Sequence, residues 1–474
     1  MARPSKLYSQ WSLEVRRSRL FSPGDRVGVG VSGGPDSTLL LHFMKQYSQQ
    51  AGFSLFAVHF NHHLRGAESD ADEQFAAAQA GQLRLDFLRG EARVARAARA
   101  SHRNLEATAR ELRYRFFFSL VNEGRLDKVV TAHSANDQAE TVLLRLLRGS
   151  GTRGLGGIYP VLEGTIVRPF LSLTRAEIEA ELRAKNLKFR TDSSNLDLRF
   201  ARNRVRHHLL PMLEKEFNPE IVKLLTDLAS RSRDDEAFLQ QAALERARPW
   251  RRRDRDAEKI PLRALLECHP SIQRRILREM VLSAHGSLRS ITGAHIEALR
   301  RFATSGQSGS QILMPHGLEA WREFEWLAIS PGRTNPRPQG YEFPIVPPTE
   351  VTVPETDIKL RFHIAENLDS DATQKKYNNI GVIRVDMDKL LSGLVLRNWR
   401  PGDRFQPFGT YTPLKLKVFL SKRKVPVRSR NLWPVLSCGE EIVWVHQFPP
   451  AHRVTASVAS TRALIIEVQE NKTQ

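Results

Sequence analysis

Apolar and polar residues follow two alternating patterns over the first 150 positions of the chain. Short apolar runs with the character of buried strands occupy 27–31, 53–60 and 128–132. Strands that alternate with helices in this way predict an α/β fold whose parallel sheet is covered on both faces. Ligands of such sheets bind beyond the carboxyl ends of the strands. The stretches with helical character are 38–47, 68–81, 104–121 and 136–147.

The pattern changes after this region. A glycine-rich connector at 149–157 leads into a further αβ-like stretch, and a highly charged helical pattern fills 216–304. Prolines crowd 331–352, which is typical of a linker, and short β-type runs return between 382 and 467. A chain of 474 residues has room for about three domains. We expect a nucleotide-binding domain, a helical middle domain, an irregular linker and a small α+β domain, at 1–215, 216–335, 336–381 and 382–474.

The chain is strongly basic. It has 72 Lys and Arg residues against 52 Asp and Glu residues, a formal net charge of +20, which favours attraction to nucleic acids. Its two cysteines, Cys268 and Cys438, cannot build a disulfide framework, a zinc knuckle or a Cys-x-x-Cys pair. Together with the lack of a long apolar stretch, this predicts a cytoplasmic protein outside the membrane. No motif indicates an obligatory protein partner.

A six-residue loop between the first predicted strand and its helix carries the clearest chemical signal. It reads Ser32-Gly33-Gly34-Pro35-Asp36-Ser37. Glycines let backbone N–H groups approach an anion, the helix N-terminus adds partial positive charge, and the two serines add hydroxyl donors. Proline fits the first helical turn, where a missing N–H costs little. The loop is therefore a candidate cradle for phosphates.

Asp36 is the unusual member of this loop. A carboxylate beside phosphates repels them unless a divalent cation lies between, so Asp36 indicates Mg²⁺ shared with phosphate oxygens. The loop lacks the Gly-Lys-Ser/Thr ending of a Walker A motif. Gly28, Gly30 and Gly33 have the spacing of a dinucleotide fingerprint, but the first two fall inside the predicted strand. A turn without a ligand is the remaining alternative.

Two segments concentrate the positive charge. One carries four arginines within eight residues, at 199, 202, 204 and 206. The other, 391–430, has ten Lys and Arg residues against one acid, Asp403. Cations for phosphates and aromatic rings for exposed bases compose an RNA-binding surface, whereas a solvated basic face with core aromatics is the alternative. The aromatic residues in the second segment are Trp399, Phe405, Phe408 and Tyr411.

The chain resembles a known enzyme family. Its loop at 32–37 is similar to the ATP-pyrophosphatase loop of enzymes that split ATP into AMP and pyrophosphate, and further motifs narrow the likeness to the tRNA(Ile)-lysidine synthases. The likeness is dense over 25–215 and returns at 395–447. The further motifs are Val58-His59-Phe60-Asn61-His62-His63-Leu64-Arg65, Leu105-Glu106-Ala107 with Arg110, Arg113 and Tyr114, His133 with Asp137, Gln138, Glu140 and Thr141, Arg202-Asn203 with Val205 and Arg206, and Trp399-Arg400-Pro401-Gly402-Asp403-Arg404-Phe405.

The resemblance implies a ligation on RNA. The family attaches free L-lysine to carbon 2 of the wobble cytidine in an isoleucine tRNA with a CAU anticodon. The modified tRNA then reads AUA instead of AUG and is charged with isoleucine instead of methionine. Two steps are implied: the cytidine O2 attacks the α-phosphorus of ATP, and the lysine ε-amine then displaces AMP from carbon 2.

The resemblance also implies roles for individual residues. His133, Asp137 and Glu140, spaced i, i+4 and i+7, would bind lysine, with Asp36 and His133 as catalytic groups. The local pattern alone leaves open a metal site or a solvated helix face for these three, and an ordinary surface position for Arg113. ATP and its Mg²⁺ would be bound by Ser32, Gly33, Gly34, Pro35, Asp36, Ser37 and Arg113, with the metal on Asp36. The implied tRNA contacts are Arg202, Asn203, Arg206, Arg397, Arg400, Arg404, Lys415 and Lys417.

Three positions depart from the family's usual pattern. Ser134 and Asn136 stand where a second histidine and a second aspartate are frequent, and Leu414 stands within a usually lysine-rich run. Two other functions remain as alternatives. One is a tRNA thiolase of the same fold, which usually needs a cysteine near the loop. The other is a basic RNA-binding protein without catalysis.

Overall fold

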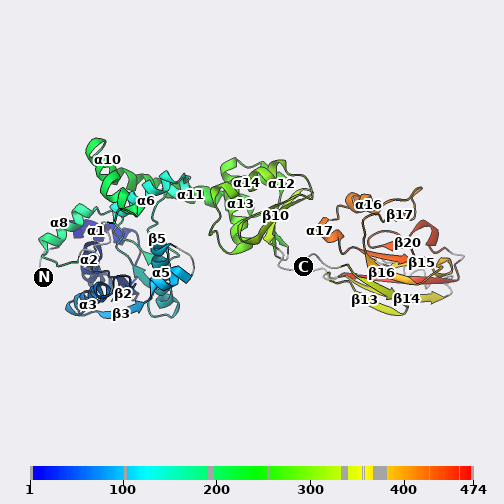
Figure 1. Cartoon of the computed structure of the whole chain (residues 1–474), viewed down its shortest axis with the longest axis horizontal. Coiled ribbons are helices and arrows are strands. Elements are labelled where there is room, and N and C mark those ends of the chain that lie inside the picture. The colour runs from blue at the N-terminus through cyan, green and yellow to red at the C-terminus, as the bar shows by residue number, and fades with distance from the viewer. Residues whose placement is uncertain are drawn as a thin grey trace. The chain divides into compact units, whose positions relative to one another are not determined.

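The fold is given by a computed structural model of the chain (Figure 1). The structure describes residues 4–100, 104–190, 197–254, 256–332, 340–354, 356, 358–366, 382–425, 427–457 and 460–470. The chain divides into two compact units, residues 1–241 and 242–474. Among the described residues, no helix combines the length and the apolarity needed to cross a membrane.

The first unit is built on a six-stranded sheet in the order β3-β2-β1-β4-β6-β5. The pairs from β3 to β6 are parallel, and β5 joins antiparallel at one edge. The predicted parallel sheet is confirmed. Because β1 and β4 are parallel neighbours, their carboxyl ends lie side by side. The strands are β1 (Arg26–Gly30), β2 (Ser54–Asn61), β3 (Asp86–Glu91), β4 (Lys128–Val130), β5 (Val161–Leu162) and β6 (Ile166–Val167).

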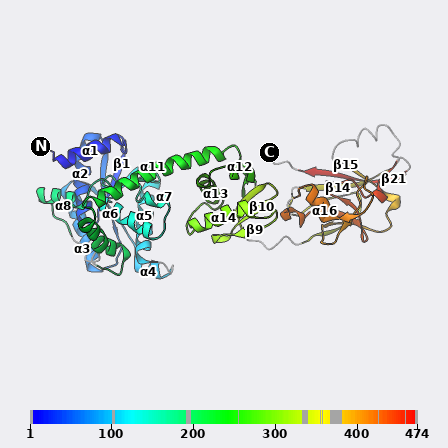
Figure 2. The same ribbon diagram turned by 90° about the horizontal axis from the view of Figure 1, so that it is seen from above.

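Helices cover both faces of this sheet, as the alternating pattern predicts (Figure 2). On one face, Val27 of β1 packs in a core with Trp11 and Leu39. On the other face, Val129 of β4 packs with Phe117. The first face is covered by α1 (Lys6–Arg17), α2 (Pro35–Ala51), α3 (Ala67–Gln82) and α8 (Arg175–Ala184), and the second by α5 (Leu105–Asn122). The unit also contains α4 (Val94–Ala100), α6 (Ala135–Leu147), α7 (Thr152–Leu155), α9 (Ala201–Arg204), η2 (Val205–Leu209), α10 (Leu210–Glu216) and most of α11 (Ile221–Ala247).

The glycines that mimic a dinucleotide fingerprint have a packing role. Gly28 and Gly30 lie within β1, as predicted. A Cβ on Gly28 would come within 2.6 Å of Leu126 Cδ1 and 2.7 Å of Val58 Cγ2. These contacts leave no room for a larger residue, so the glycine serves the close packing of the strand rather than a dinucleotide.

Residues 252–254 and 256–331 form an antiparallel sheet packed against helices, so the region expected to be a helical middle domain also contains strands. The sheet order is β7-β8-β11-β10-β9, and Ile260 and Leu327 of the sheet share a core with Leu277 of a helix. The strands are short and carry charged residues on their outer face, so they lack a continuous apolar run. The elements are β7 (Arg252–Asp254), β8 (Ala257–Pro261), α12 (Leu262–Leu266), α13 (Pro270–His285), α14 (Gly293–Ser305), β9 (Gln311–Leu313), η3 (Pro315–Gly317), β10 (Leu318–Glu323) and β11 (Trp326–Pro331).

The remaining part contains two four-stranded antiparallel sheets, β12-β16-β19-β20 and β13-β14-β21-β15, and the short pair β17-β18. The segment 336–381, expected to be an irregular linker, contributes β12 to β14; its residues 336–339, 355, 357 and 367–381 lie outside the described residues. Pro344 fits β12 because this strand is at a sheet edge, where a proline breaks no ladder. The strands are β12 (Glu342–Ile345), β13 (Thr349–Thr352), β14 (Ile358–Glu366), β15 (Val382–Asp386), β16 (Leu394–Asn398), β17 (Arg404–Phe405), β18 (Leu414–Lys415), β19 (Pro434–Cys438), β20 (Glu441–Val445) and β21 (Arg462–Glu470). The helices are η4 (Met387–Lys389), α16 (Leu416–Lys422), α17 (Val427–Arg430) and η5 (His452–Val454).

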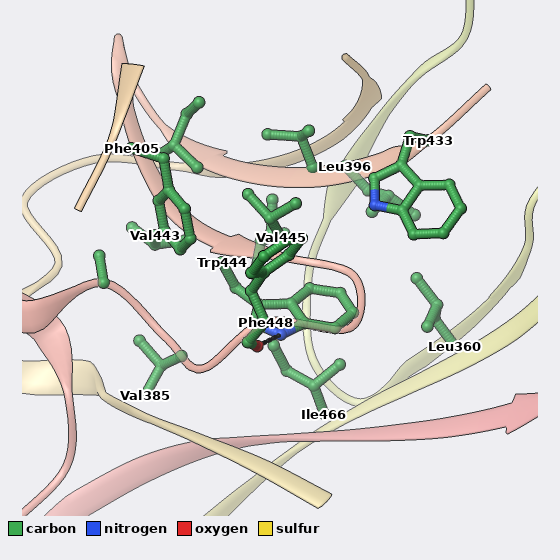
Figure 3. Close-up of a cluster of buried hydrophobic side chains, with 14 of the residues drawn as sticks. Leu360, Val385, Leu396, Phe405, Trp433, Val443, Trp444, Val445, Phe448 and Ile466 are labelled. Atoms are coloured by element: carbon green, nitrogen blue, oxygen red, sulfur yellow. Dashed lines mark hydrogen bonds between the residues drawn. The ribbon is translucent and has the colours of Figure 1, made fainter. Parts of the chain in front are cut away.

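One hydrophobic core joins these sheets (Figure 3). Trp444 is fully buried there, and its indole Nε1 donates a hydrogen bond of 3.0 Å to the carbonyl of Phe448. Leu360, Leu396 and Ile466 reach the same core from β14, β16 and β21. Residues 341–366 therefore belong to the same module as the C-terminal strands, and the expected boundary at 382 falls inside that module.

Candidate active site

The predicted phosphate loop lies at the carboxyl end of β1. Gly33 has φ of +83°, a left-handed conformation that favours glycine, and a Cβ there would meet Phe75 Cδ1 at 3.3 Å. Gly34 is the N-cap of α2 and has no side chain to bind the first-turn N–H groups. Pro35 occupies the first turn, as predicted. The helix N-terminus therefore keeps donors for an anion.

The two serines of the loop have different surroundings. Their hydroxyls lie 3.1 Å apart, and Ser37 Oγ accepts the Ser32 N–H at 3.2 Å and donates to the Gly34 carbonyl at 3.1 Å. Ser37 is buried, whereas Ser32 is exposed. Ser37 therefore fixes the loop conformation, and Ser32 is the hydroxyl that a ligand can reach.

Asp36 has a buried oxygen without a donor. Its Oδ1 has no hydrogen-bond partner among the described residues. Burial raises the pKa of Asp36 to about 6, and the charge of Asp137 adds to the rise. A divalent cation would satisfy this oxygen, so the carboxylate fits Mg²⁺. The described residues contain no cluster of three metal-ligating side chains, so such a cation needs phosphate oxygens as further ligands.

The neighbouring strand places the three expected lysine-site residues next to this loop. His133 lies in the link after β4, ahead of α6, so it does not share a helix face with Asp137 and Glu140. Asp137 Oδ2 accepts the Ser134 N–H at 3.0 Å. Asn136 Oδ1 accepts the N–H of Arg175 at 2.8 Å. The two departures from the family pattern, Ser134 and Asn136, thus take part in capping α6 and in joining it to α8.

Four largely buried charges, of which Glu140 is the most buried, form an ion-pair cluster of Asp137, Glu140, Arg202 and Arg206. Asp137 Oδ1 lies 2.7 Å from an Arg202 nitrogen and 3.2 Å from an Arg206 nitrogen. Glu140 accepts Arg202 Nε at 2.8 Å and Arg206 Nε at 2.5 Å. The side chains of Glu140 and Arg206 are only 1% and 13% exposed. Both arginines, which were expected to contact tRNA, are paired within this cluster, because charges removed from water need counter-charges.

The segment that carries these arginines is held by its own contacts. α9 continues into the π-helical turn η2, where Val205 packs in a core with Val142 of α6. Asn203 is buried, and its Nδ2 donates to the Asp197 carbonyl at 2.9 Å. Asn203, which was expected to contact tRNA, therefore holds the start of this segment.

Further arginines make the surroundings strongly positive. Arg110 and Arg168 each donate to the Tyr114 hydroxyl at 3.0 Å. The Nε of Arg113 is buried without a partner among the described residues. Burial lowers the pKa of His133 well below its usual value, and these arginines reinforce the effect against the opposing charge of Asp137. His133 is therefore neutral at pH 7.

The five cations expected in the C-terminal module fall into different settings. Arg397 is buried and makes a two-pronged ion pair with Asp403, with both N···O distances at 2.9 Å, so it is not a free RNA contact. Arg400 is paired with Glu342 at 2.7 Å on the surface. Exposed positions are occupied by Arg404, Lys415 and Lys417, near the exposed rings of Phe408 and Tyr411 in sequence.

Comparisons with known proteins decide the family. The PP-loop domain matches residues 8–213, the TilS substrate binding domain 261–327 and the TilS substrate C-terminal domain 394–465. A tRNA(Ile)-lysidine synthase of Solibacter usitatus is 37% identical, over 91% of this chain and 95% of that protein. The chain belongs to the tRNA(Ile)-lysidine synthase family. A synthase of Dehalococcoides mccartyi is 31% identical over 96% of this chain and 97% of its own, and one of Clostridium tetani is 27% identical over 97% of both.

One arginine near the active site of this synthase family member was not predicted from the sequence. Arg168 follows the two-residue strand β6 and has no motif around it. It reaches Tyr114 because β6 lies next to β4 in the sheet, a neighbour relation that is not local in sequence. Both cysteines belong to the second unit, so the first unit contains no cysteine of the kind that a thiolase usually needs near its loop.

The ion-pair cluster predicts a large cost for losing one carboxylate. Glu140→Gln leaves two buried guanidiniums with Asp137 alone, so the first unit should lose about 3 kcal/mol of unfolding free energy, measured by calorimetry. Glu179→Gln is the matched control, because Glu179 lies 3.9 Å from Arg183 on an exposed helix face. It should cost less than about 0.5 kcal/mol. Equal losses would contradict a buried cluster.

The same cluster predicts a defined acid sensitivity. Burial alone would raise the pKa of Asp137, but the charges of Arg202 and Arg206 and the hydrogen bond from the Ser134 N–H hold it at about 2, below the value of about 3.9 in an unfolded chain. Its contribution is therefore complete above about pH 4 and lost as the pH falls toward 2. Urea unfolding should show the difference between the native protein and Asp137→Asn shrinking over that window. A difference that stays constant down to pH 2 speaks against the pairing.

Arg397→Ala separates a structural role from an RNA contact. The substitution leaves the largely buried Asp403 carboxylate without a counter-charge. The unfolding free energy of the second unit should therefore fall by about 3 kcal/mol. The exposed Lys415→Ala should leave the thermal midpoint unchanged and weaken RNA binding. If Arg397→Ala lowers RNA affinity at unchanged stability, the buried role is wrong.

Proposed function

We propose that this protein ligates L-lysine to carbon 2 of the wobble cytidine in an isoleucine tRNA with a CAU anticodon, at the expense of ATP. One observation carries the proposal: a phosphate loop with the unpaired Asp36 lies beside a charged cluster that matches a free amino acid. Family membership and the PP-loop match support ATP and tRNA as substrates. We place the reaction in the cytoplasm and expect it to need no protein partner.

The first step activates the base. The cytidine O2 attacks the α-phosphorus of ATP, the bond from that phosphorus to the bridging oxygen breaks, and pyrophosphate leaves. The N–H groups of Gly34 and the first turn of α2, with the Ser32 hydroxyl, would hold the departing phosphates. Asp36 would hold Mg²⁺, which neutralises charge on the phosphates. Arg113, with its unpaired Nε, would add a fixed cation.

The second step transfers lysine. The neutral ε-amine attacks carbon 2 of the adenylated base, the bond from carbon 2 to oxygen breaks, and AMP leaves with that oxygen. The amine must first lose a proton. The arginines that lower the pKa of His133 would lower the pKa of a lysine ammonium in the same place. The neutral imidazole of His133 is then the candidate proton acceptor.

The ion-pair cluster suits the other end of the substrate. Free lysine carries an α-ammonium and an α-carboxylate on one carbon. Asp137 and Glu140 offer a counter-charge to the α-ammonium. Arg202 and Arg206 offer one to the α-carboxylate. Lysine would therefore enter by exchanging partners within the cluster, which leaves no buried charge unpaired.

The test is ligation of labelled lysine. The full-length protein with ATP, labelled L-lysine and the isoleucine transcript should incorporate label into RNA and release one AMP per lysine. Asp36→Asn should reduce AMP release at least a hundredfold while transcript binding persists, because it removes the anionic metal ligand but no cation. Asp86→Asn, an exposed aspartate at the amino end of β3, is the control and should keep full activity.

Each other outcome has a meaning. RNA binding without label or AMP favours a non-catalytic RNA-binding protein. AMP release that needs a sulfur donor instead of lysine favours a thiolase. Near-normal turnover by Asp36→Asn removes that carboxylate from the reaction.

A further inference from the structure

A second cavity opens at the same edge of the first unit's sheet, outside the site described above. Its volume is about 660 Å³. It lies where β2 and β3 end, at Asn61 and Glu91. Because all parallel strands point their carboxyl ends to one edge, this cavity opens on the same side of the sheet as the phosphate loop and His133. We call it the α4 cavity; it is lined by His63, Glu91, Ala92, Arg93, Ala95, Arg96 and Arg99.

Three arginines at the helix α4, which is labelled in Figure 2, line this cavity: Arg93 just before the helix, and Arg96 and Arg99 within it. Val94 and Ala98, one turn apart, are buried and fix the inner face of the helix. Arg93, Arg96 and Arg99 follow at spacings of three on the outer side, and all three are exposed. The short helix thus presents a row of guanidinium groups.

These guanidinium groups lack counter-charges. Within the described part of the chain, no carboxylate forms an ion pair with Arg93, Arg96 or Arg99. The one acidic residue of the lining, Glu91, has its Oε2 at 3.2 Å from His63 Nε2. Grouped like charges repel one another, and this repulsion is relieved when an anion binds between them.

We propose that the α4 cavity binds the phosphodiester backbone of the RNA substrate next to the nucleoside that is modified. The proposal rests on the proposed function only in taking RNA as the substrate. The phosphate loop binds through backbone N–H groups and a helix N-terminus, whereas this cavity offers guanidinium groups on long stems and no glycine-rich turn. Such side chains grip backbone phosphates without reading the bases. They would hold the strand while the wobble cytidine enters the reaction site.

The test removes two positive charges at the α4 cavity. A control variant removes two positive charges at the opposite edge of the sheet, and the RNA affinities of the two variants are compared. The test variant is Arg96→Gln/Arg99→Gln. The control is Arg84→Gln/Arg125→Gln, because these exposed arginines precede β3 and β4 at the amino ends of the strands. Affinity for the full-length transcript is measured by filter binding over a range of salt concentrations. The test variant should bind about tenfold more weakly at 0.15 M salt, with the salt slope reduced by about 1.4 for two single-strand phosphate contacts.

Kinetics of the same variants complete the test. The KM for tRNA should rise in the test variant, while kcat at saturating tRNA and the KM for ATP stay at native values. A raised KM for ATP with unchanged transcript affinity would make the cavity a nucleotide site and overturn the proposal. Equal weakening in test and control variants would show general electrostatic attraction and overturn it as well. RNA binding is measured without catalysis. If the native protein fails to transfer lysine, the proposed function is refuted, but the comparison of RNA affinities between test and control variants still tests the α4 cavity.

Discussion

The first unit depends on four largely buried charges that neutralise one another. Asp137 and Glu140 project from α6, and Arg202 and Arg206 reach them from α9 and η2. Such a cluster adds little net stability compared with an apolar core, but losing one of its members is costly because a charge is then left without a partner. It therefore fixes the segment 201–209 against α6. It also leaves the charged groups in a geometry that a zwitterion can enter without stranding any of them.

The charge balance around this cluster explains the character of the site. Arg110, Arg113 and Arg168 add three cations, and the two that donate to Tyr114 help lower the pKa of its hydroxyl although burial opposes this. The site is consequently positive despite its carboxylates. A positive pocket attracts the triphosphate and favours an uncharged amine, which are the two requirements of the chemistry proposed above.

Local patterns in the sequence predicted the parts of the fold that local forces determine. The loop at 32–37, the strand before it and the helix at 104–121 are confirmed, since each depends on neighbours in the chain. The strand β3 was missed because its sequence, Asp-Phe-Leu-Arg-Gly-Glu, is half polar and is specified by its pairing with β2. Arg397 looked like a surface cation, and only the turn that brings Asp403 to it reveals a buried pair. The catalytic and binding roles of the site residues are proposals.

The pairing of β14 with β21 has a consequence for how the polypeptide is made. Ile358 to Glu366 lie opposite Glu470 to Arg462 along nine positions, so the partner of β14 is translated about a hundred residues later. During synthesis β14 emerges with a bare hydrogen-bonding edge, while the first unit already has every strand of its sheet. A nascent chain should thus complete its nucleotide-binding sheet well before β21 is made and joins β14 to β15. A chain that stops before residue 462 would therefore leave β15 unpaired and β14 paired only with β13, and these bare strand edges would promote aggregation.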